Sequence, residues 1–167
     1  MTSADDKTGE GRKPARNAGR RELSAAARLY AVQALFQMEA AGQSSNRVRR
    51  EFEDWRIGTE YEGETSPEAD NALFARIIED AVTWQSRIDQ MTDRALVAKW
   101  PIDRIDPVLR ALFRAAGAEM MTPATPPKVV ITEYVRVAQA FFDTGREAKF
   151  VNAVLDHMAR EARPEAF

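Results

Sequence analysis

The most regular pattern of apolar positions lies between Val129 and Phe142, where the chain reads VVITEYVRVAQAFF. Apolar side chains recur there at the spacing of a helix that buries one face in a core. The segment from Phe150 to Met158, FVNAVLDHM, repeats this pattern, and the polar stretch between the two contains Gly145, a residue typical of helix ends. The two segments predict a helical hairpin, and other helices must cover its apolar faces.

Four more segments with helical spacing precede this hairpin. They run from Leu23 to Ala41, from Asn46 to Trp55, from Ser66-Pro67 to Trp100-Pro101, and from Asp106-Pro107 to Met120. Serine or aspartate before proline predicts a helix start, because the first caps free N–H groups and proline suits the first helical position. In the second segment Val48, Phe52 and Trp55 form the inward face. No stretch has the alternation of a strand, so the pattern predicts an all-α bundle of about six to seven helices.

Composition removes several classes of function. Of the 167 residues, 44% are hydrophobic and 30% charged, as in an ordinary globular domain. The absence of cysteine excludes disulfides, thiolate zinc sites and cysteine nucleophiles, and one histidine, His157, cannot form a multi-ligand zinc site. No Walker loop, GxSxG elbow or GxGxxG turn is present. We therefore expect no catalysis, no metal and no cofactor.

The chain also lacks the segments that direct proteins to membranes. No apolar run approaches the roughly 20 residues that span a bilayer. The first residues, MTSADDKTGEGRK, contain no apolar segment of the kind found in secretory signals. The expected location is the cytoplasm, without membrane attachment.

Charge is distributed unevenly along the chain. The net charge is −2, yet residues 12–28 hold six cations and one anion. Residues 1–22 are too polar to form a core, so we expect a flexible basic extension there and a helical domain at 23–167. Arg20, Arg21 and Arg28 fall on one side of the first helix if that helix extends upstream. Arginines in this pattern bind phosphates, although an inert basic leader has the same composition.

Four sequence blocks follow one another between about residues 23 and 160. They are Ala31 to Phe36 (AVQALF), Val108 to Arg110 with Ala118-Glu119, Pro126 to Val135 (PPKVVITEYV), and Phe150 to Asp156 (FVNAVLD). In content, order and spacing these blocks resemble the NusB family of bacterial transcription antitermination factors. Thr132 and Ala153 stand where the family usually has asparagine and glycine.

The resemblance implies a two-lobed helical bundle that acts by binding and not by catalysis. Members of this family pair with NusE, a ribosomal protein of the small subunit. The pair binds the boxA element of nascent ribosomal RNA leaders, then joins RNA polymerase and other Nus factors and favours reading through terminators. Family members resemble either monomers or homodimers, and the sequence leaves the oligomeric state open.

The resemblance also implies positions for the binding sites. Arg28 matches the arginine-rich segment that contacts RNA in the family, while Arg20 and Arg21 lie about two turns upstream of it. Lys149, Phe150 and Asn152 match the start of a helix implicated in RNA contact. For Phe150 the spacing equally predicts core packing, and Glu133 and Arg110 are expected in an ion pair or a helix cap.

Phe36 matches an aromatic residue on the side from which NusE and RNA approach. Its place in the apolar stripe of the first helix allows core packing, partner contact or both.

Two other functions are left open by the sequence. One is a recognition domain like those of ribosomal RNA cytosine methyltransferases, although no cofactor-binding domain follows. The other is a helical regulatory module that binds only protein.

Overall fold

A computed structural model describes residues 16–96, 105–142 and 145–167, with side chains from Gly19 onward. The helices are α2 (Arg16–Ala41), α3 (Ser45–Trp55), α4 (Asn71–Thr83), α5 (Gln85–Ala95), α6 (Pro107–Met120), α7 (Pro127–Phe141), α8 (Gly145–Ala162) and the short 3-10 helix η2 (Pro164–Ala166). Two short strands, β1 (Glu60–Tyr61) and β2 (Glu64–Thr65), form an antiparallel pair. The predicted all-α fold is confirmed, and this small hairpin is added to it.

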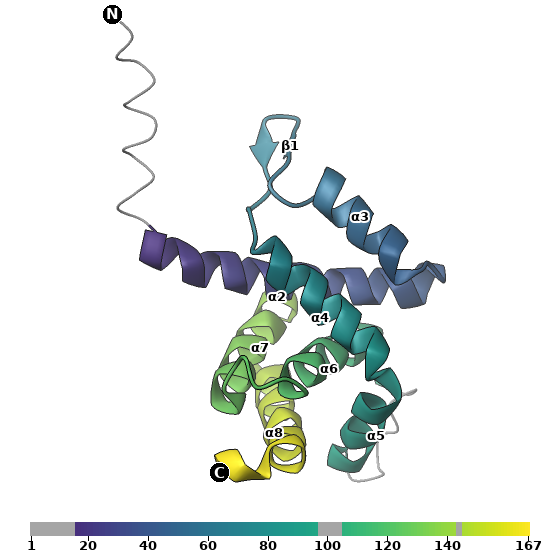
Figure 1. Ribbon diagram of the computed structural model, residues 1–167, viewed down its shortest axis with the longest axis vertical. Coiled ribbons are helices and arrows are strands. Elements are labelled where there is room, and N and C mark those ends of the chain that lie inside the picture. Colours follow the sequence, from purple (N-terminus) through teal and green to yellow (C-terminus); the bar gives the residue numbers. More distant parts are fainter. Residues whose placement is uncertain (1–15, 97–104, 143–144) are drawn as a thin grey trace, which may run out of the picture.

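The long helix α2 runs across the molecule and divides it into two groups of helices (Figure 1). On one side α3 and α4 pack against it, and on the other side it meets α6 and α7. Helices α5 and α8 complete the second group through contacts with α6. Phe52 and Phe74 stack in the first group with ring centroids 5.7 Å apart. Because both groups pack on α2, this helix holds the fold together.

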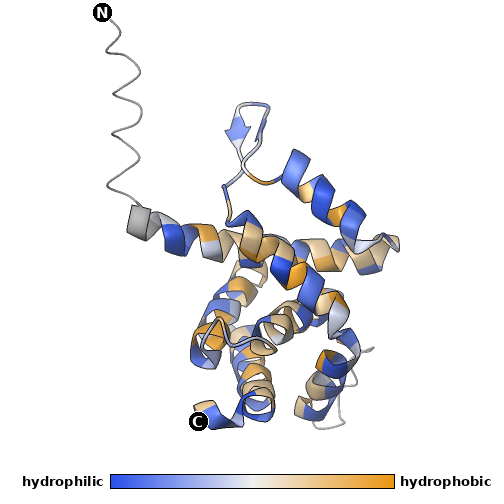
Figure 2. Cartoon of the chain, viewed as in Figure 1, coloured by the Kyte–Doolittle hydropathy of each residue, from blue (hydrophilic) through white to orange (hydrophobic). Residues whose placement is uncertain are grey.

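Hydropathy follows this arrangement. Figure 2 shows polar residues on the outer face of α3, whose inner face buries Val48 and Phe52. The central helix α6 buries ten of its fourteen residues, because neighbours surround it. Within the described segments, no helix has the length and apolar character needed to cross a membrane.

Two predicted features of the third helix are wrong. The helix begins at Asn71 and not at Ser66-Pro67, and Asp70 caps it by accepting a hydrogen bond from the Leu73 N–H at 3.0 Å. The Pro67 carbonyl oxygen is engaged elsewhere, since it accepts hydrogen bonds from the Tyr30 hydroxyl at 2.7 Å and the Gly58 N–H at 3.0 Å. These tertiary contacts hold the segment in an irregular conformation.

The expected single long helix is also interrupted. Trp84, with φ −107° and ψ 14°, separates α4 from α5. The change of direction lets Ile88 and Met91 enter the core, where α5 contacts α6 and α8. The predicted end at Trp100-Pro101 lies outside the described residues.

The boundaries of two further helices differ from those predicted. Gly145 was expected to end a helix, but it is the first residue of α8. The first helix begins at Arg16, so residues 16–22 of the expected extension are helical. The rest of that extension, residues 1–15, lies outside the described part of the chain.

Trp55 was expected to face inward, and this is wrong because its side chain is 76% exposed. Helix α3 ends at this residue, and the chain turns at Arg56 with φ −120°. Ile57, only 8% exposed, then enters the core in place of the tryptophan. The β-hairpin follows directly. Its turn residues Glu62 and Gly63 have φ values of 52° and 82°, as a type I′ turn requires.

Gly117 permits the close packing of α6 on α5. A Cβ atom added at this position would collide with the side chain of Ile88. We therefore expect Gly117→Ala to lower the free energy of unfolding by about 1–3 kcal/mol in urea titrations. Gly19→Ala is the matched control, because nothing lies within 4 Å of that position on α2. The control should keep or slightly raise stability, since alanine favours helix. Equal stability of both variants would contradict this packing.

Candidate nucleic-acid and protein interface

The first turns of α2 carry two exposed arginines, Arg20 and Arg21. Neither side chain forms an ion pair with another described residue. Arg21 precedes Arg28 by seven residues, which in an α-helix is about 20° short of two full turns. Arg21 and Arg28 therefore lie nearly on one line along the helix, whereas Arg20, the third member of the predicted row, lies about 80° around the axis from Arg28. This end of α2 presents free positive charge to solvent.

Arg28 itself is buried, and it fixes α2 to the rest of the fold. Its Nε donates a hydrogen bond to Glu119 Oε2 at 2.8 Å, and its Nη2 donates to Glu119 Oε1 at 3.1 Å. The two side chains are 8% and 5% exposed. The hydroxyl of Thr125 donates to Glu119 Oε1 at 3.1 Å, and Glu133 of α7 lies 3.9 Å from Arg28 Nη1. The cluster therefore joins α2, α6 and α7.

Burial and charge keep this cluster in one protonation state. Burial alone lowers the pKa of Arg28, but the hydrogen bonds and negative charge of Glu119 outweigh it, so the pKa is raised. Tyr134 is fully buried nearby, and burial together with the charge of Glu119 raises its pKa well above the ordinary value. Its hydroxyl has no hydrogen-bond partner among the described residues. Arg28 therefore stays charged and Tyr134 neutral, and the guanidinium is committed to carboxylates inside the protein.

A second set of ion pairs fixes the C-terminal end of α2. Arg110 Nη2 of α6 lies 2.6 Å from Glu39 Oε1, and Arg114 Nη1 lies 3.5 Å from Glu39 Oε2. Arg114 also makes a bidentate pair with Asp89 of α5. The expectation that Arg110 belongs to an ion pair is met here with Glu39, while Glu133 pairs with Arg28 and Arg136. Both halves of α2 are thus held against α6.

An open groove of about 500 Å³ lies beside the C-terminal half of α2. It is lined by Val32, Gln33, Phe36, Gln37, Ala40, Ala41, Arg56, Val108 and Phe141. Phe36 is 37% exposed in this groove and is absent from the buried core. At its edge Arg56 Nη2 donates to Gln37 Oε1 at 3.2 Å. The groove offers an apolar floor and a polar margin, which suits a protein segment.

The start of α8 combines exposed polar residues with one packed aromatic ring. Lys149 and Asn152 are exposed, whereas Phe150 is half-buried. The Phe150 ring meets Phe113 of α6 edge to face, with centroids 6.3 Å apart. Among the described contacts, none joins these residues to Arg20 or Arg21. The residues predicted to contact RNA thus come from two different helices, α2 and α8.

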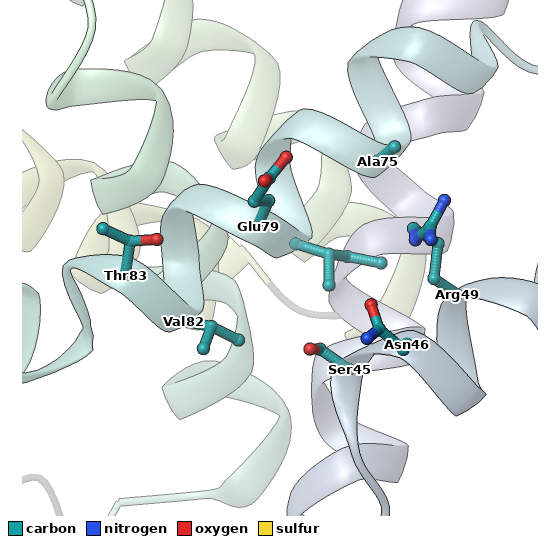
Figure 3. Close-up of a pocket in the computed structure, with 8 residues that line it drawn as sticks. Ser45, Asn46, Arg49, Ala75, Glu79, Val82 and Thr83 are labelled. Atoms are coloured by element: carbon teal, nitrogen blue, oxygen red, sulfur yellow. The ribbon is translucent and has the colours of Figure 1, made fainter.

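A second groove, of about 380 Å³, lies between α3 and α4 (Figure 3). Ser45, Asn46 and Arg49 come from α3, and Glu79 and Thr83 come from α4. Sequence reasoning missed this groove because its walls belong to different helices. Arg49 pairs with Glu53 at 3.2 Å, so its charge is already balanced in part. Throughout the described residues, no group of three or more potential ligands is placed to hold a metal ion.

Comparison with known proteins decides the family. The sequence-family model described as “NusB family” matches residues 25–160 of this chain. The chain belongs to the NusB family. The transcription antitermination protein NusB of Maricaulis maris is 43% identical over 89% of this chain and 92% of its own length. That of Granulibacter bethesdensis is 44% identical over 85% of this chain and 90% of its own.

Solved structures of NusB proteins share the fold. NusB of T. maritima is 28% identical with a TM-score of 0.66, covering 86% of this chain and 95% of that one. The NusB-family fold also matches a structure described as antitermination factors NusB and NusE in complex with dsRNA. That match has 21% identity and a TM-score of 0.63, over 82% of this chain and 96% of the other. The predicted NusB-like bundle is confirmed, and NusB-family membership confirms that the chain is not an enzyme.

The burial of the Arg28–Glu119 pair predicts how charge variants should rank in their free energy of unfolding. Glu119→Gln leaves the buried guanidinium with only the more distant Glu133 carboxylate as counter-charge, so the free energy of unfolding should fall by about 3 kcal/mol. The double variant Arg28→Met/Glu119→Leu removes both charges and should recover most of that loss. Glu39→Gln breaks a more exposed pair and should cost about 0–1 kcal/mol. Urea titrations of the four proteins test the order, and a neutral Glu119→Gln would show that the pair does not fix α2.

Proposed function

We propose that this NusB-family chain is an RNA-binding transcription antitermination factor that pairs with NusE and binds the boxA element of nascent ribosomal RNA leaders. The observation that carries the proposal is the arrangement of α2, which has free arginines at one end and an open apolar groove at the other. The relatives named transcription antitermination proteins, and the solved complex of NusB and NusE with RNA, support the choice of ligands.

On the RNA side, Arg20 and Arg21 are the proposed phosphate contacts. Both are exposed, and arginine pairs with phosphate through a planar fork of donors. Arg28 acts differently in this proposal, because its donors are occupied by Glu119 and it orients the helix that carries the two free arginines. Lys149 and Asn152 provide a second polar contact, and Phe150 supports them by packing on Phe113.

On the protein side, Phe36 and its groove are the proposed NusE contact. Arg21 and Phe36 are fifteen residues apart on one helix, or about 22 Å along its axis. A partner in the groove therefore lies close enough for one RNA strand to touch both proteins. Two weak contacts joined in this way hold RNA far better than either alone.

The wider assembly follows from this pairing. In the proposal the bound pair joins RNA polymerase and other Nus factors in the cytoplasm and favours transcription through terminators. A homodimer that buries the Phe36 groove would compete with NusE for it. Regulation by self-association is thus compatible with the same surface.

The double variant Arg20→Ala/Arg21→Ala tests the RNA side. Loss of two phosphate contacts should reduce the slope of log K against log salt by about 1.4, since each contact to single-stranded RNA contributes about 0.7. The slope is measured with boxA RNA in the presence of NusE, by fluorescence anisotropy. Arg47→Ala/Arg50→Ala removes two exposed arginines of α3 and is the matched control. If both double variants lower the slope equally, the contact is not specific to α2.

Phe36→Ala tests the protein side. The variant should weaken NusE binding at least about tenfold in calorimetric titrations, because an aromatic anchor in a groove contributes strongly to an interface. Its stability should fall by less than the roughly 3–5 kcal/mol typical of a buried phenylalanine. Val129→Ala, at an equally exposed apolar position of α7, should bind NusE normally. Unfolding of Phe36→Ala with unchanged affinity of the folded fraction would assign Phe36 to the core.

A further inference from the structure

The segment from Trp55 to Ser66, here called the arm, stands out from the helical body (Figure 1). Trp55 and Tyr61 are each 76% exposed, more than any other large hydrophobic residue in the described part of the chain. Neither ring contacts another described aromatic ring or cation. Tryptophan and tyrosine are enriched among the residues that dominate protein interfaces, so two such exposed rings on one segment make it a candidate binding surface.

The arm is held in place by its base. The Gly58 N–H donates to the Pro67 carbonyl at 3.0 Å, and the Ser66 N–H donates to the Thr59 carbonyl at 2.8 Å. The hydroxyl of Thr59 reaches the carbonyl oxygens of Trp55 and Arg56 at 3.0 and 3.1 Å. Ile57 anchors the segment in the core. A surface fixed in this way loses little conformational entropy on binding.

The hairpin places an aromatic ring and a carboxylate on the same face. Tyr61 and Glu64 are directly opposite one another across the strand pair. Side chains at such positions have Cβ atoms about 4.5–5.5 Å apart. A guanidinium or ammonium group can therefore lie over the Tyr61 ring and reach the Glu64 carboxylate at the same time.

The charge of the arm selects the kind of partner. Between Ile57 and Ala75 the chain has no lysine or arginine, whereas Glu60, Glu62 and Glu64 all lie in the hairpin. All three are exposed, and none forms an ion pair with a described residue. This charge repels RNA phosphates and attracts lysine and arginine.

The arm is continuous with the groove that contains Phe36. Arg56, the residue after Trp55, lines that groove and bonds to Gln37 of α2. A protein seated in the groove therefore already contacts Arg56, the second residue of the arm, and reaches the hairpin if it extends past this residue. The arm and the groove thus form one continuous surface, with an apolar part on α2 and an acidic, aromatic part on the hairpin.

We propose that the arm is a second docking surface for the protein that occupies the Phe36 groove, and that it binds a lysine- or arginine-bearing segment of that protein through Tyr61, Glu64 and Trp55. The proposal rests on the proposed function, in which NusE is that protein. It adds a recognition element outside the helical body. Binding there depends on salt because the contact is between opposite charges.

The test measures NusE binding by calorimetry with the full-length chain at low and moderate salt. Tyr61→Ala and Glu64→Gln should each weaken binding about fivefold, and the double variant should lose less than the product of the two. The variant Glu60→Gln/Glu62→Asn/Glu64→Gln removes the charge and keeps the turn, because asparagine accepts the positive φ of Glu62. It should reduce the dependence of NusE affinity on salt concentration.

Trp55→Ala should weaken NusE binding. Trp84→Ala, which changes an exposed tryptophan outside the arm, should not.

The outcomes separate this proposal from the function on which it rests. If the wild-type chain binds NusE and all arm variants bind equally well, the arm plays no part and the proposed function stands. If the wild-type chain does not bind NusE, both proposals fail. If the charge variant gains affinity for RNA and keeps its affinity for NusE, the arm only repels nucleic acid and the docking proposal is wrong. Circular dichroism melts confirm that each variant is folded.

Discussion

The buried pair of Arg28 and Glu119 is the constraint on which the structure depends. Removing two charges from water is costly, and only their bidentate contact and the surrounding donors offset that cost. The geometry of that contact allows one orientation of α2 against α6. Glu39, bound to Arg110 and Arg114, fixes the same two helices near the C-terminal end of α2. These contacts fix α2 between Arg28 and Glu39, with the turns that carry Arg20 and Arg21 on one side of the fixed part and the Phe36 groove beside it.

The proposed functions depend on the surfaces along and beside helix α2. Its first turns offer free arginines, its second half borders an apolar groove, and Arg56 connects that groove to the acidic arm. The three surfaces differ in chemistry, so each suits a different ligand group: phosphate, apolar side chains and cationic side chains. The chain has a net charge of −2, but its positive and negative side chains are separated between the start of α2 and the arm. In the proposal this separation lets one small protein bind RNA and also bind NusE, which contacts the same RNA. No step in this scheme requires catalysis, which agrees with membership of the NusB family.

Much of this arrangement was predictable from the local sequence pattern. Each prediction that was wrong has a physical cause. The helical hairpin of α7 and α8 and the Asp106-Pro107 start follow from short-range spacing and capping. Ser66-Pro67 failed as a start because tertiary hydrogen bonds to Pro67 override local preference. Trp55 failed because Ile57 fills the core position after the helix ends. The pairing of Arg28 was invisible because Glu119 is 91 residues away. The groove likewise arises from segments that only the fold brings together. The hairpin of the arm is local, and its turn at Glu62 and Gly63 was not predicted from the sequence.

The most direct test of the central claim compares boxA RNA with a scrambled RNA of equal length and composition. Affinities are measured at one salt concentration for the chain alone, for NusE alone and for the two together. If α2 presents joint surfaces, the pair should bind boxA at least about tenfold more tightly than either protein alone and more tightly than the scrambled RNA. Equal binding of the two RNAs by the pair, or no gain over the separate proteins, would contradict the account.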